Sequence, residues 1–268
     1  MTSAPTPSQP TFSPPWTAAA ELLPVMQRQG YAVLDAASVA QLCQVDFRDL
    51  AEFQASWAGL PPDQHLKDGG RYRRRRHACF VVEGERCDAV AHRPHWQPLS
   101  YNALHGGMER RFEPMETRFV QAPAWARLVT GIGTVCDRLS AAAAAAGGPW
   151  SVEAHQFRID TAGGIGRPTP EGAHRDGVDF VAVILIGRSG VKGGETRVFD
   201  AQGPSGQRFT LSQPWSMLLL DDSRVIHETT PIQPLDTDGW RDTLVLTYRR
   251  GGFQAAAPAA ATVTAEPS

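Results

Sequence analysis

Two histidines and one aspartate in the second half of the chain have the types and the spacing of metal ligands. His174 and Asp176 stand two residues apart in the stretch EGAHRDGVDF (171–180), and His227 follows in SRVIHETTP (223–231). In an extended chain, residues two apart point to the same side. His174 and Asp176 can therefore face one cavity, and the chain before His227 is long enough for several strands to bring that histidine to the same place.

Two imidazoles and one carboxylate are typical of non-heme Fe(II) oxygenase sites, where they occupy one face of an octahedron and leave three positions open. A zinc site would more often contain cysteine or a third histidine, and a zinc peptidase would place two histidines four residues apart on a helix. A His-x-Asp pair on its own is weak evidence, because a histidine hydrogen-bonded to a carboxylate is often only structural. The sequence around the pair must therefore distinguish a metal site from a structural contact.

A cation and a hydroxyl follow the second histidine. Arg241 opens the apolar stretch WRDTLVLTYRR (240–250), and Thr243 lies two residues later on the same strand face. A 2-oxo acid chelated to Fe(II) would need a guanidinium and a hydroxyl for its far carboxylate, and these two residues offer both. The alternative is a surface ion pair between Arg241 and Asp238 or Asp242, which the apolar strand makes the weaker interpretation.

The elements that must position these residues change character along the chain. The first part predicts a helix ending at Gly30, a strand at 31–35 and a helix from Ser38 to about Trp57. A long amphipathic helix is expected within 122–148. From Ser151 to Arg250 the apolar period becomes two, with many short runs separated by glycine, proline and aspartate, which favours an antiparallel sandwich or barrel over a parallel sheet.

Composition restricts the class of protein. The chain has 268 residues and a net charge of −2, so no overall basic character points to nucleic acid. We expect a flexible leader (1–16), one domain (17–250) and a flexible tail (251–268), without a secretory signal or a membrane span. The four cysteines are scattered and form no metal-binding or disulfide pattern, so we expect reduced thiols in a cytoplasmic protein.

The sequence resembles the Fe(II)/2-oxoglutarate-dependent dioxygenases. Within them it is most similar to the bacterial group that contains the L-isoleucine hydroxylases and the biofilm stress protein homologues. The resemblance rests on RYRRRRHACF, HQFRID, PTPEGAHRDGVDFV, GGETRVFD and IHETTPI, which lie between Arg71 and about Tyr248. It implies an α+β protein with a double-stranded β-helix (jelly-roll) core and N-terminal and flanking helices. Thr243 departs conservatively from the serine that is frequent in the family.

The resemblance also implies roles. His174, Asp176 and His227 would bind Fe(II), and Arg241 with Thr243 would anchor 2-oxoglutarate. With O2, the enzyme would release succinate and CO2 while it hydroxylates a C–H bond or oxidises a thioether. Analogy favours a free amino acid or a derivative as the small-molecule substrate; another small metabolite, such as a natural-product intermediate, and a non-catalytic metal-binding jelly roll stay open.

Two polar pairs are candidates for substrate binding. Gln156 and Arg158 share one face of the strand HQFRI (155–159), where they either hold an acidic ligand or form a structural pair; we favour the ligand. Arg73 and Arg75 alternate with the arginines beside them, so we expect this pair to line the substrate mouth and bind a carboxylate. A solvated edge and a phosphate or nucleic-acid patch are the alternatives, and nucleic acid ranks last.

The loop-rich stretch before the long helix offers a lid. Tyr101 and Asn102 are candidates for covering the metal and contacting substrate, and an ordered surface loop is the equal alternative. His92, His95 and His105 have no carboxylate at ligand spacing, so we expect ordinary loop histidines.

Overall fold

The computed structural model describes residues 12–102, 104, 106–142 and 147–255. The elements before the first long strand are η1 (Ala19–Glu21), α1 (Leu22–Gln29), β1 (Tyr31–Leu34), α2 (Ala36–Cys43), α3 (Arg48–Ala51) and η2 (Glu52–Gly59). The middle elements are β2 (Arg73–Glu83), β3 (Arg86–Ala89), α4 (Thr117–Val120) and α5 (Pro123–Ala142). The strand-rich part comprises β4 (Trp150–Asp160), β5 (Phe180–Ser189), β6 (Val191–Gly193), β7 (Thr196–Asp200), β8 (Gly206–Phe209), β9 (Met217–Asp221), β10 (Val225–Thr229), β11 (Ile232–Pro234) and β12 (Trp240–Arg249).

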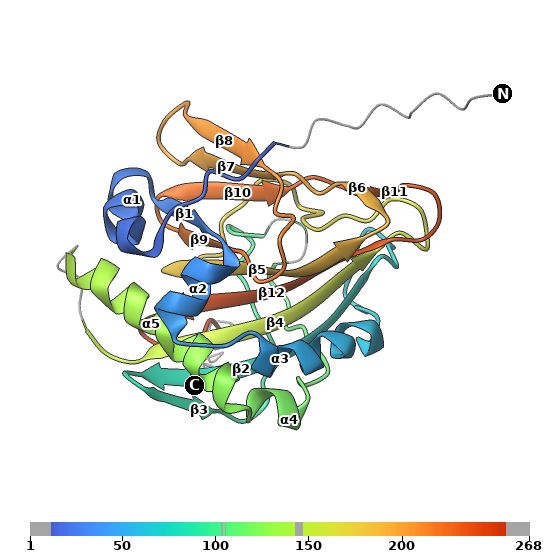
Figure 1. Ribbon diagram of the computed structural model, residues 1–268. Helices are drawn as coiled ribbons and strands as arrows, with labels where there is room; N and C mark the ends of the chain where they lie inside the picture. Colours follow the sequence, from blue (N-terminus) through green and yellow to red (C-terminus); the bar gives the residue numbers. More distant parts are fainter. Residues whose placement is uncertain (1–11, 103, 105, 143–146, 256–268) are drawn as a thin grey trace, which may run out of the picture.

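The strands form antiparallel sheets. A seven-stranded sheet has the order β1-β9-β5-β12-β4-β2-β3, and β10-β7-β8 and β11-β6 form two smaller sheets. Every ladder between these strands is antiparallel. Figure 1 shows α2, α3 and α5 along one face of the large sheet, with β7, β8 and β10 on its other side. The prediction of an α+β protein with a jelly-roll core and flanking helices is confirmed.

The N-terminal helices differ from the prediction in their boundaries. Gly30 ends α1 as expected, with the left-handed φ of 77° that a glycine adopts without strain. The next helix, however, starts at Ala36, because the Asp35 side chain accepts a hydrogen bond from the Ser38 amide and acts as the cap that we assigned to Ser38. It ends where Gln44 is left-handed (φ 50°), so the expected continuous helix is instead three short ones.

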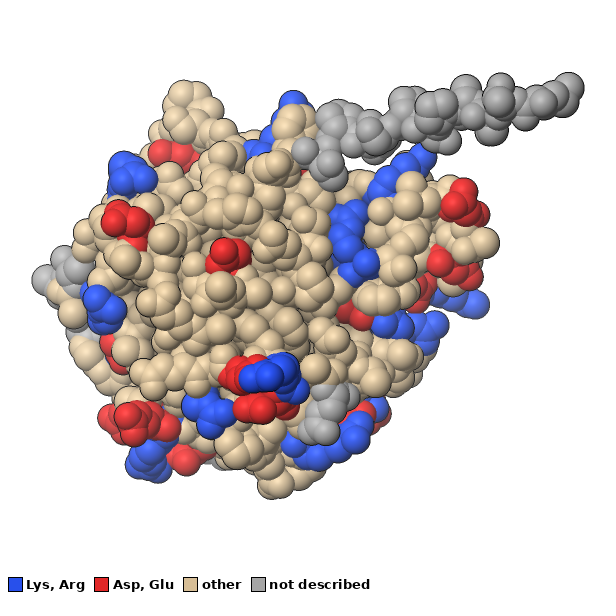
Figure 2. Space-filling view, in the orientation of Figure 1, with Lys and Arg blue, Asp and Glu red and all other residues tan. Residues whose placement is uncertain are grey.

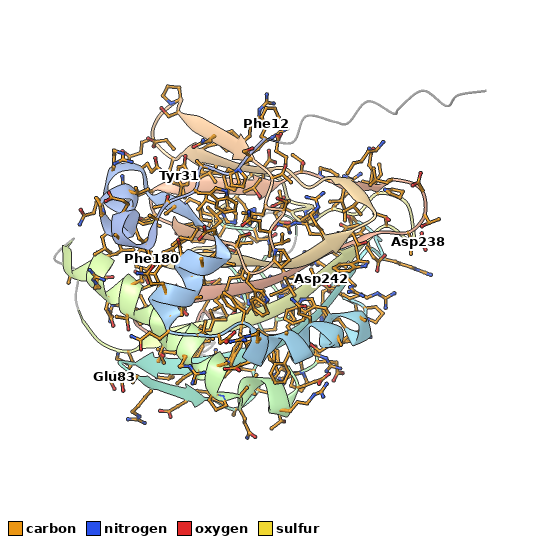
Figure 3. The ribbon with its side chains drawn as sticks, viewed as in Figure 1. Phe12, Tyr31, Glu83, Phe180, Asp238 and Asp242 are labelled. Atoms are coloured by element: carbon orange, nitrogen blue, oxygen red, sulfur yellow. The ribbon has the colours of Figure 1, made fainter. Side chains whose placement is uncertain are left out.

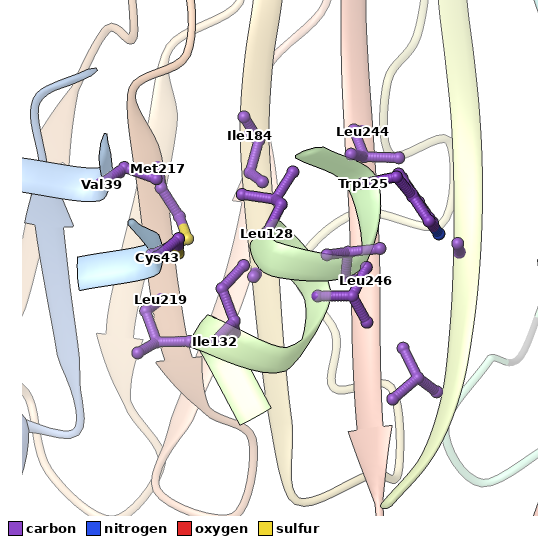
Figure 4. Close-up of a cluster of buried hydrophobic side chains, with 14 of the residues drawn as sticks. Val39, Cys43, Trp125, Leu128, Ile132, Ile184, Met217, Leu219, Leu244 and Leu246 are labelled. Atoms are coloured by element: carbon purple, nitrogen blue, oxygen red, sulfur yellow. The ribbon is translucent and has the colours of Figure 1, made fainter. Parts of the chain in front are cut away.

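The large sheet has two chemically different faces. Leu244 and Leu246 of β12 point toward the helices, where they are buried against Trp125 and Leu128 of α5 (Figure 4). Fully burying a side chain of this kind stabilises the fold by roughly 1.5–3 kcal/mol. The intervening residues of the strands point into the jelly roll, because side chains alternate along a strand. Helix packing on one face therefore fixes which residues line the interior.

The interior is apolar at one end and polar at the other. At the apolar end, Val181 and Leu220 of the large sheet lie in one buried cluster with Val198, Phe209 and Val225 of the small sheet. The polar end is lined by the inner faces of β2, β4 and β12. Because the apolar cluster closes one end, polar side chains can gather around a cavity at the other.

Both chain ends have contacts that the predicted leader and tail did not include. The Phe12 carbonyl accepts a hydrogen bond from Thr210, and Trp16 forms a bridge with Val33. At the other end, Gln254 donates from Nε2 to the Gly177 carbonyl at 2.6 Å. The parts 12–16 and 251–255 are thus attached to the domain, whereas 1–11 and 256–268 lie outside the described residues. Among the described helices, none has the length and apolar character needed to cross a membrane.

Candidate active site

His174, Asp176 and His227 come together at the polar end of the jelly roll. His174 lies just before β5 and His227 lies in β10, and their backbones form a two-way bridge in which each amide donates to the other's carbonyl at 3.0 Å. One ligand atom from each of the three side chains lies within 4.8 Å of the others. Arg175 points away, toward the Tyr101 ring. The alternation expected from the His-x-Asp spacing is present.

Hydrogen bonding and burial leave ring nitrogens of the group available to a divalent metal. His174 donates from Nδ1 to the Gly172 carbonyl at 2.9 Å, which leaves Nε2 free for a metal. Burial, with His174 beside it, lowers the pKa of His227 well below its usual value, so that imidazole is neutral. Burial also lowers the pKa of His174, but Asp176 and Glu171 outweigh it and the net pKa is raised. Two nitrogens and a carboxylate in this arrangement fit Fe(II).

Asp222 holds the backbone that carries Asp176. Its carboxylate accepts hydrogen bonds from the amides of Asp176 (2.9 Å), Gly177 (2.7 Å) and Val178 (3.1 Å). Burial, together with the nearby Asp176 charge, raises the pKa of Asp222 to about 7. Sequence reasoning missed this residue, since its pairing with the His-x-Asp segment depends on β9 lying beside β5.

Gln97 orients the Asp176 side chain. Its Nε2 donates to Oδ1 of Asp176 at 3.1 Å, and its Oε1 accepts from Arg110 at 2.8 Å and from Asn102 at 3.2 Å. The two donors fix which end of the Gln97 amide faces the carboxylate. The loop-rich stretch therefore supplies residues that position a metal ligand without binding the metal themselves. No sequence signal distinguished Gln97 or Arg110 from their neighbours.

Arg241 and Thr243 line the same cavity, so Arg241 is not at the surface, where the alternative ion pair would have placed it. Arg241 is 3% exposed, and its Nε and Nη2 are buried without a hydrogen-bond partner among the described residues. Burial, with Arg188 nearby, lowers its pKa to about 10. Asp242 instead binds Arg158, and Figure 3 labels Asp238 at the tip of the loop before β12. Unpaired donors on a buried guanidinium fit the far carboxylate of 2-oxoglutarate.

One cavity joins these groups. Its wall comes from β2, β4, β5, β10 and β12, from the loop-rich stretch and from the segment before β5. The lining residues are Arg73, Arg75, His95, Gln97, Asn102, Arg110, His155, Phe157, Ile159, Pro168, Thr169, Glu171, His174, Asp176, Val183, His227, Thr229, Arg241, Thr243, Val245 and Thr247.

The arginine block alternates as expected. Arg73 and Arg75 are buried in the cavity wall, and the exposure of Arg74 and Arg76 is intermediate. Arg73 forms an ion pair with the buried Asp63, N to O 2.7 Å. On the face drawn in Figure 2, acidic side chains stand among the basic ones. Within the block, Arg73 and Arg75 are buried and Arg74 forms an ion pair with Asp160, N to O 3.0 Å, so these three arginines do not form an exposed basic strip of the kind a nucleic-acid site would need.

Arg75 is held rigidly. Its guanidinium lies 3.7 Å from the ring centre of Phe112 and 4.4 Å from that of Phe157, so the two rings pack against it. Nη2 donates to His155 Nδ1 at 2.7 Å, and Nε is buried without a partner among the described residues. A preorganised guanidinium with a free donor in a cavity wall is suited to bind an anion.

A second group of possible metal ligands lies behind Arg75 and consists of His77, His95, Glu153 and His155. Glu153 Oε2 lies 3.6 Å from Nε2 of both His77 and His155 and is hydrogen-bonded to His95 Nδ1. Since Arg75 donates to His155 Nδ1, the His155 proton is on Nε2, and that atom has no lone pair for a metal. We interpret this group, the Glu153 cluster, as a hydrogen-bonded support for Arg75.

The Glu153 cluster corrects the expectation for His95. Burial lowers the pKa of His95 to about 4, so it is a buried neutral donor and not an ordinary loop histidine. Burial likewise lowers the pKa of His77 and of His155. His92 is hydrogen-bonded to the Phe112 carbonyl at 2.7 Å, and its ring lies 6.1 Å from that of His77. His105 lies outside the described residues.

Three of the predicted substrate residues lie outside the cavity. Gln156 and Arg158 share a strand face as expected, but it is the face toward the helices: Gln156 donates to Ser56 at 3.0 Å, and Arg158 forms a two-bond ion pair with Asp242. The structural pair was the correct alternative, because the opposite face of β4 lines the cavity. Tyr101 is also absent from the cavity wall formed by the described residues, whereas its neighbour Asn102 belongs to it.

Comparison with known proteins gives a consistent picture. The family model described as 2OG-Fe dioxygenase matches residues 54–247. A crystal structure of a bsmA homolog from Methylobium petroleophilum PM1 is 55% identical, with a TM-score of 0.84 over 90% of this chain and 97% of that chain. No curated protein matches the sequence.

Two more distant structures share the fold. IDO from Bacillus thuringiensis is 18% identical, with a TM-score of 0.66 over 89% of this chain and 100% of that one. The Fe(II)/(alpha)ketoglutarate-dependent dioxygenase TqaL is also 18% identical, with a TM-score of 0.65 over 87% of each chain. At this identity the likeness concerns the fold alone.

Proposed function

Because the chain belongs to the 2OG-Fe dioxygenase family, we propose that it oxidises a free amino acid or a close derivative, by C–H hydroxylation or thioether oxidation. Enzymes of this family use Fe(II), 2-oxoglutarate and O2. We assign His174, Asp176 and His227 as the iron ligands. Arg241 and Thr243 are the proposed anchor of the 2-oxoglutarate carboxylate.

One observation carries this assignment. The group of two histidines and a carboxylate shares a cavity with a buried guanidinium whose Nε and Nη2 lack partners among the described residues. A buried unpaired cation is costly for a fold, so an anionic ligand is expected at Arg241. A purely structural His-Asp contact would give no reason for an unpaired arginine in the same wall.

A second positive region is available for the substrate. Arg75 and Arg110 line the cavity, and each has a buried Nε without a partner among the described residues. Arg73 forms the closer ion pair with Asp63, 2.7 Å against 3.8 Å for Arg75, which makes Arg75 the better candidate for the substrate carboxylate. Val183 and Val245 supply apolar surface in the same wall for a substrate side chain. The combination suits a small carboxylic acid with an apolar part.

The protein's own residues have definable tasks in such a reaction. Gln97 and Asp222 orient the carboxylate ligand and its backbone, and Arg241 and Arg75 place two carboxylates at separate positions in the cavity. Bound iron supplies the activation of O2 that couples decarboxylation of 2-oxoglutarate to succinate with oxidation of the substrate. The free cysteines are compatible with a cytoplasmic location, which we also propose.

The test is an anaerobic titration of the protein with Fe(II) and 2-oxoglutarate, followed by visible absorption, for the wild type, His227→Ala and Arg241→Gln. We expect a weak charge-transfer band in the wild type and its loss in His227→Ala. In Arg241→Gln, a higher concentration of 2-oxoglutarate should be needed to form the band. Arg76→Gln, on the face of β2 away from the cavity, is the control and should leave the band unchanged.

Substrate class is tested by adding O2 and a panel of L-amino acids, with succinate and product mass as readouts. A gain of one oxygen on a panel member supports the proposal. Succinate formation only with other small metabolites would keep the oxygenase and overturn the amino-acid assignment. A metal complex without any substrate-stimulated succinate would favour a non-catalytic binding protein.

A further inference from the structure

Glu171 is a carboxylate in the cavity wall that the proposed reaction has not used. Its Oε2 is buried without a hydrogen-bond partner among the described residues, and its Oε1 lies 3.7 Å from His174 Nε2. The side chain is only 12% exposed. A carboxylate oxygen taken out of water costs free energy unless a donor or a cation replaces the water, so the missing partner is expected to come from a ligand.

The segment that carries Glu171 is well fixed. Thr169 Oγ1 donates to the Thr229 carbonyl at 3.0 Å and accepts from the Thr229 amide at 3.1 Å, which attaches the segment to the end of β10. On the other side, the Gly172 carbonyl accepts the hydrogen bond from His174 Nδ1. Glu171 is therefore held between two anchored points, and its place beside the metal ligands is built into the fold.

The surroundings of Glu171 combine both signs of charge. Arg110 lies in the same wall, and its pKa is lowered to about 10 by burial and by Arg73, while Asp63 and Glu171 oppose that shift. A carboxylate and a guanidinium in the wall of one cavity present a dipolar site. A zwitterion, whose ammonium and carboxylate are adjacent, matches such a site without adding net charge to the cavity.

We propose that Glu171 binds the ammonium group of the substrate and makes the enzyme selective for acids that carry a protonated amine. Arg75 and Arg110 bind the carboxylate, so the two charges of an amino acid are bound by charged groups of opposite sign in one cavity wall. This inference rests on the proposed amino-acid substrate. It makes Glu171 a specificity residue with no part in metal binding.

A competing assignment is that Glu171 is a fourth protein ligand of the metal, since it lies near His174. The group of mutually close ligand atoms contains His174, Asp176 and His227 but not Glu171. The two assignments differ in what Glu171→Gln should do. A specificity residue leaves Fe(II) affinity intact, whereas loss of a ligand lowers it.

The experiment compares paired probes in the wild type and in Glu171→Gln. Each pair is an aliphatic L-amino acid and the carboxylic acid in which hydrogen replaces the ammonium group, for example L-leucine and 4-methylpentanoic acid. Succinate formation gives kcat/KM for each probe, and anaerobic titration gives the affinity for Fe(II). Glu195→Gln is the matched control, because Glu195 is similarly buried (16% exposed) but pairs with Arg197 away from the cavity.

We expect the wild type to prefer the amino acid and Glu171→Gln to reduce that preference by about tenfold or more, through KM of the amino acid, because a charge-assisted hydrogen bond is lost. The Fe(II) affinity and the control variant should match the wild type. If amino acids are oxidised and the preference is unchanged in Glu171→Gln, the inference fails while the proposed function stands. Loss of Fe(II) affinity would establish the ligand assignment instead.

Two further outcomes separate the inference from the proposed function. If only acids without an ammonium group are oxidised, both the amino-acid substrate and the role of Glu171 are wrong, although the oxygenase activity is retained. If no probe gives succinate, calorimetric binding of the same pairs to the anaerobic Fe(II) and 2-oxoglutarate complex decides. Binding of the amino acid that does not weaken in Glu171→Gln, or no binding at all, would overturn the inference.

Discussion

The Nε2 of Gln97 lies 3.1 Å from Oδ1 of Asp176, so a residue from the loop-rich middle of the chain orients the carboxylate of the metal group. Arg110 and Asn102 fix the Gln97 amide in turn. Partners of this kind, one step behind the ligands, commonly change metal affinity by 10–100-fold when they are removed.

Gln97→Leu should therefore lower the affinity for Fe(II) by about 10–100-fold without unfolding the protein, because it removes the donor to Asp176 but leaves all three ligands. Anaerobic Fe(II) titration measures the effect, and circular dichroism checks the fold. Gln233→Leu, at an exposed position of β11, is the control. An unchanged affinity in Gln97→Leu would show that Asp176 needs no such support.

The stacked position of Arg75 leads to a prediction about the substrate. Arg75→Lys keeps the charge but loses the planar group that packs against Phe112 and Phe157 and donates to His155. We expect kcat/KM for the substrate to fall by roughly 10–100-fold, while the affinity for 2-oxoglutarate is retained. Arg76→Lys serves as the control. If 2-oxoglutarate affinity falls instead, Arg75 rather than Arg241 holds that carboxylate.

The residues that the sequence could identify are those whose geometry is local. His174 and Asp176 face one cavity because strand-like alternation needs no knowledge of the neighbouring chain, and the same rule separated Arg73 and Arg75 from Arg74. Alternation also placed Gln156 and Arg158 together, but it could not say which face of their strand would meet the helices. That choice depends on α5 packing against the sheet.

The supporting residues were beyond prediction for a related reason. Gln97, Asp222 and Glu153 act through partners distant in the chain. Gln97 and His95, the partner of Glu153, belong to the loop-rich stretch, and Asp222 follows β9, which lies beside β5. An antiparallel sandwich or barrel could be predicted from the short strands and their spacing, and the family resemblance specified the jelly roll. The pairing order and the path of the loop-rich stretch, which decide these contacts, leave no mark in a single sequence.

Arg158 and Arg241 lie on neighbouring strands but are predicted to affect different properties. Replacing Arg158 should lower stability, and replacing Arg241 should abolish binding of 2-oxoglutarate. Arg158→Met removes the partner of the buried Asp242 and should reduce the free energy of unfolding by about 3 kcal/mol. Arg241→Met removes a buried cation without a partner among the described residues, so the apoprotein should lose little or no stability while binding of 2-oxoglutarate is lost. Urea denaturation and 2-oxoglutarate titration measure the two effects, and a reversed pattern would contradict both assignments.

The Glu153 cluster predicts how stability depends on pH. Burial lowers the pKa of His95 to about 4, and it lowers that of His77 and His155 as well. An unfolded histidine titrates near pH 6.5, so between about pH 6.5 and 4 the unfolded chain binds protons that the folded protein does not. Stability must therefore fall as the pH falls through this range.

His95 alone should contribute a loss of about 2 kcal/mol between pH 7.5 and pH 5, from the separation of its folded and unfolded pKa values. His95→Asn keeps a side-chain donor near Glu153 but has no titrating group, so the free energy of unfolding should depend less steeply on pH by that amount. Urea denaturation of the metal-free protein at the two pH values measures this, with His65→Asn, at a partly exposed site, as the control. Equal pH dependence in the wild type and His95→Asn would mean that His95 is charged in the folded protein, and the support for Arg75 would then have to be an ion pair between His95 and Glu153 in place of a neutral hydrogen bond.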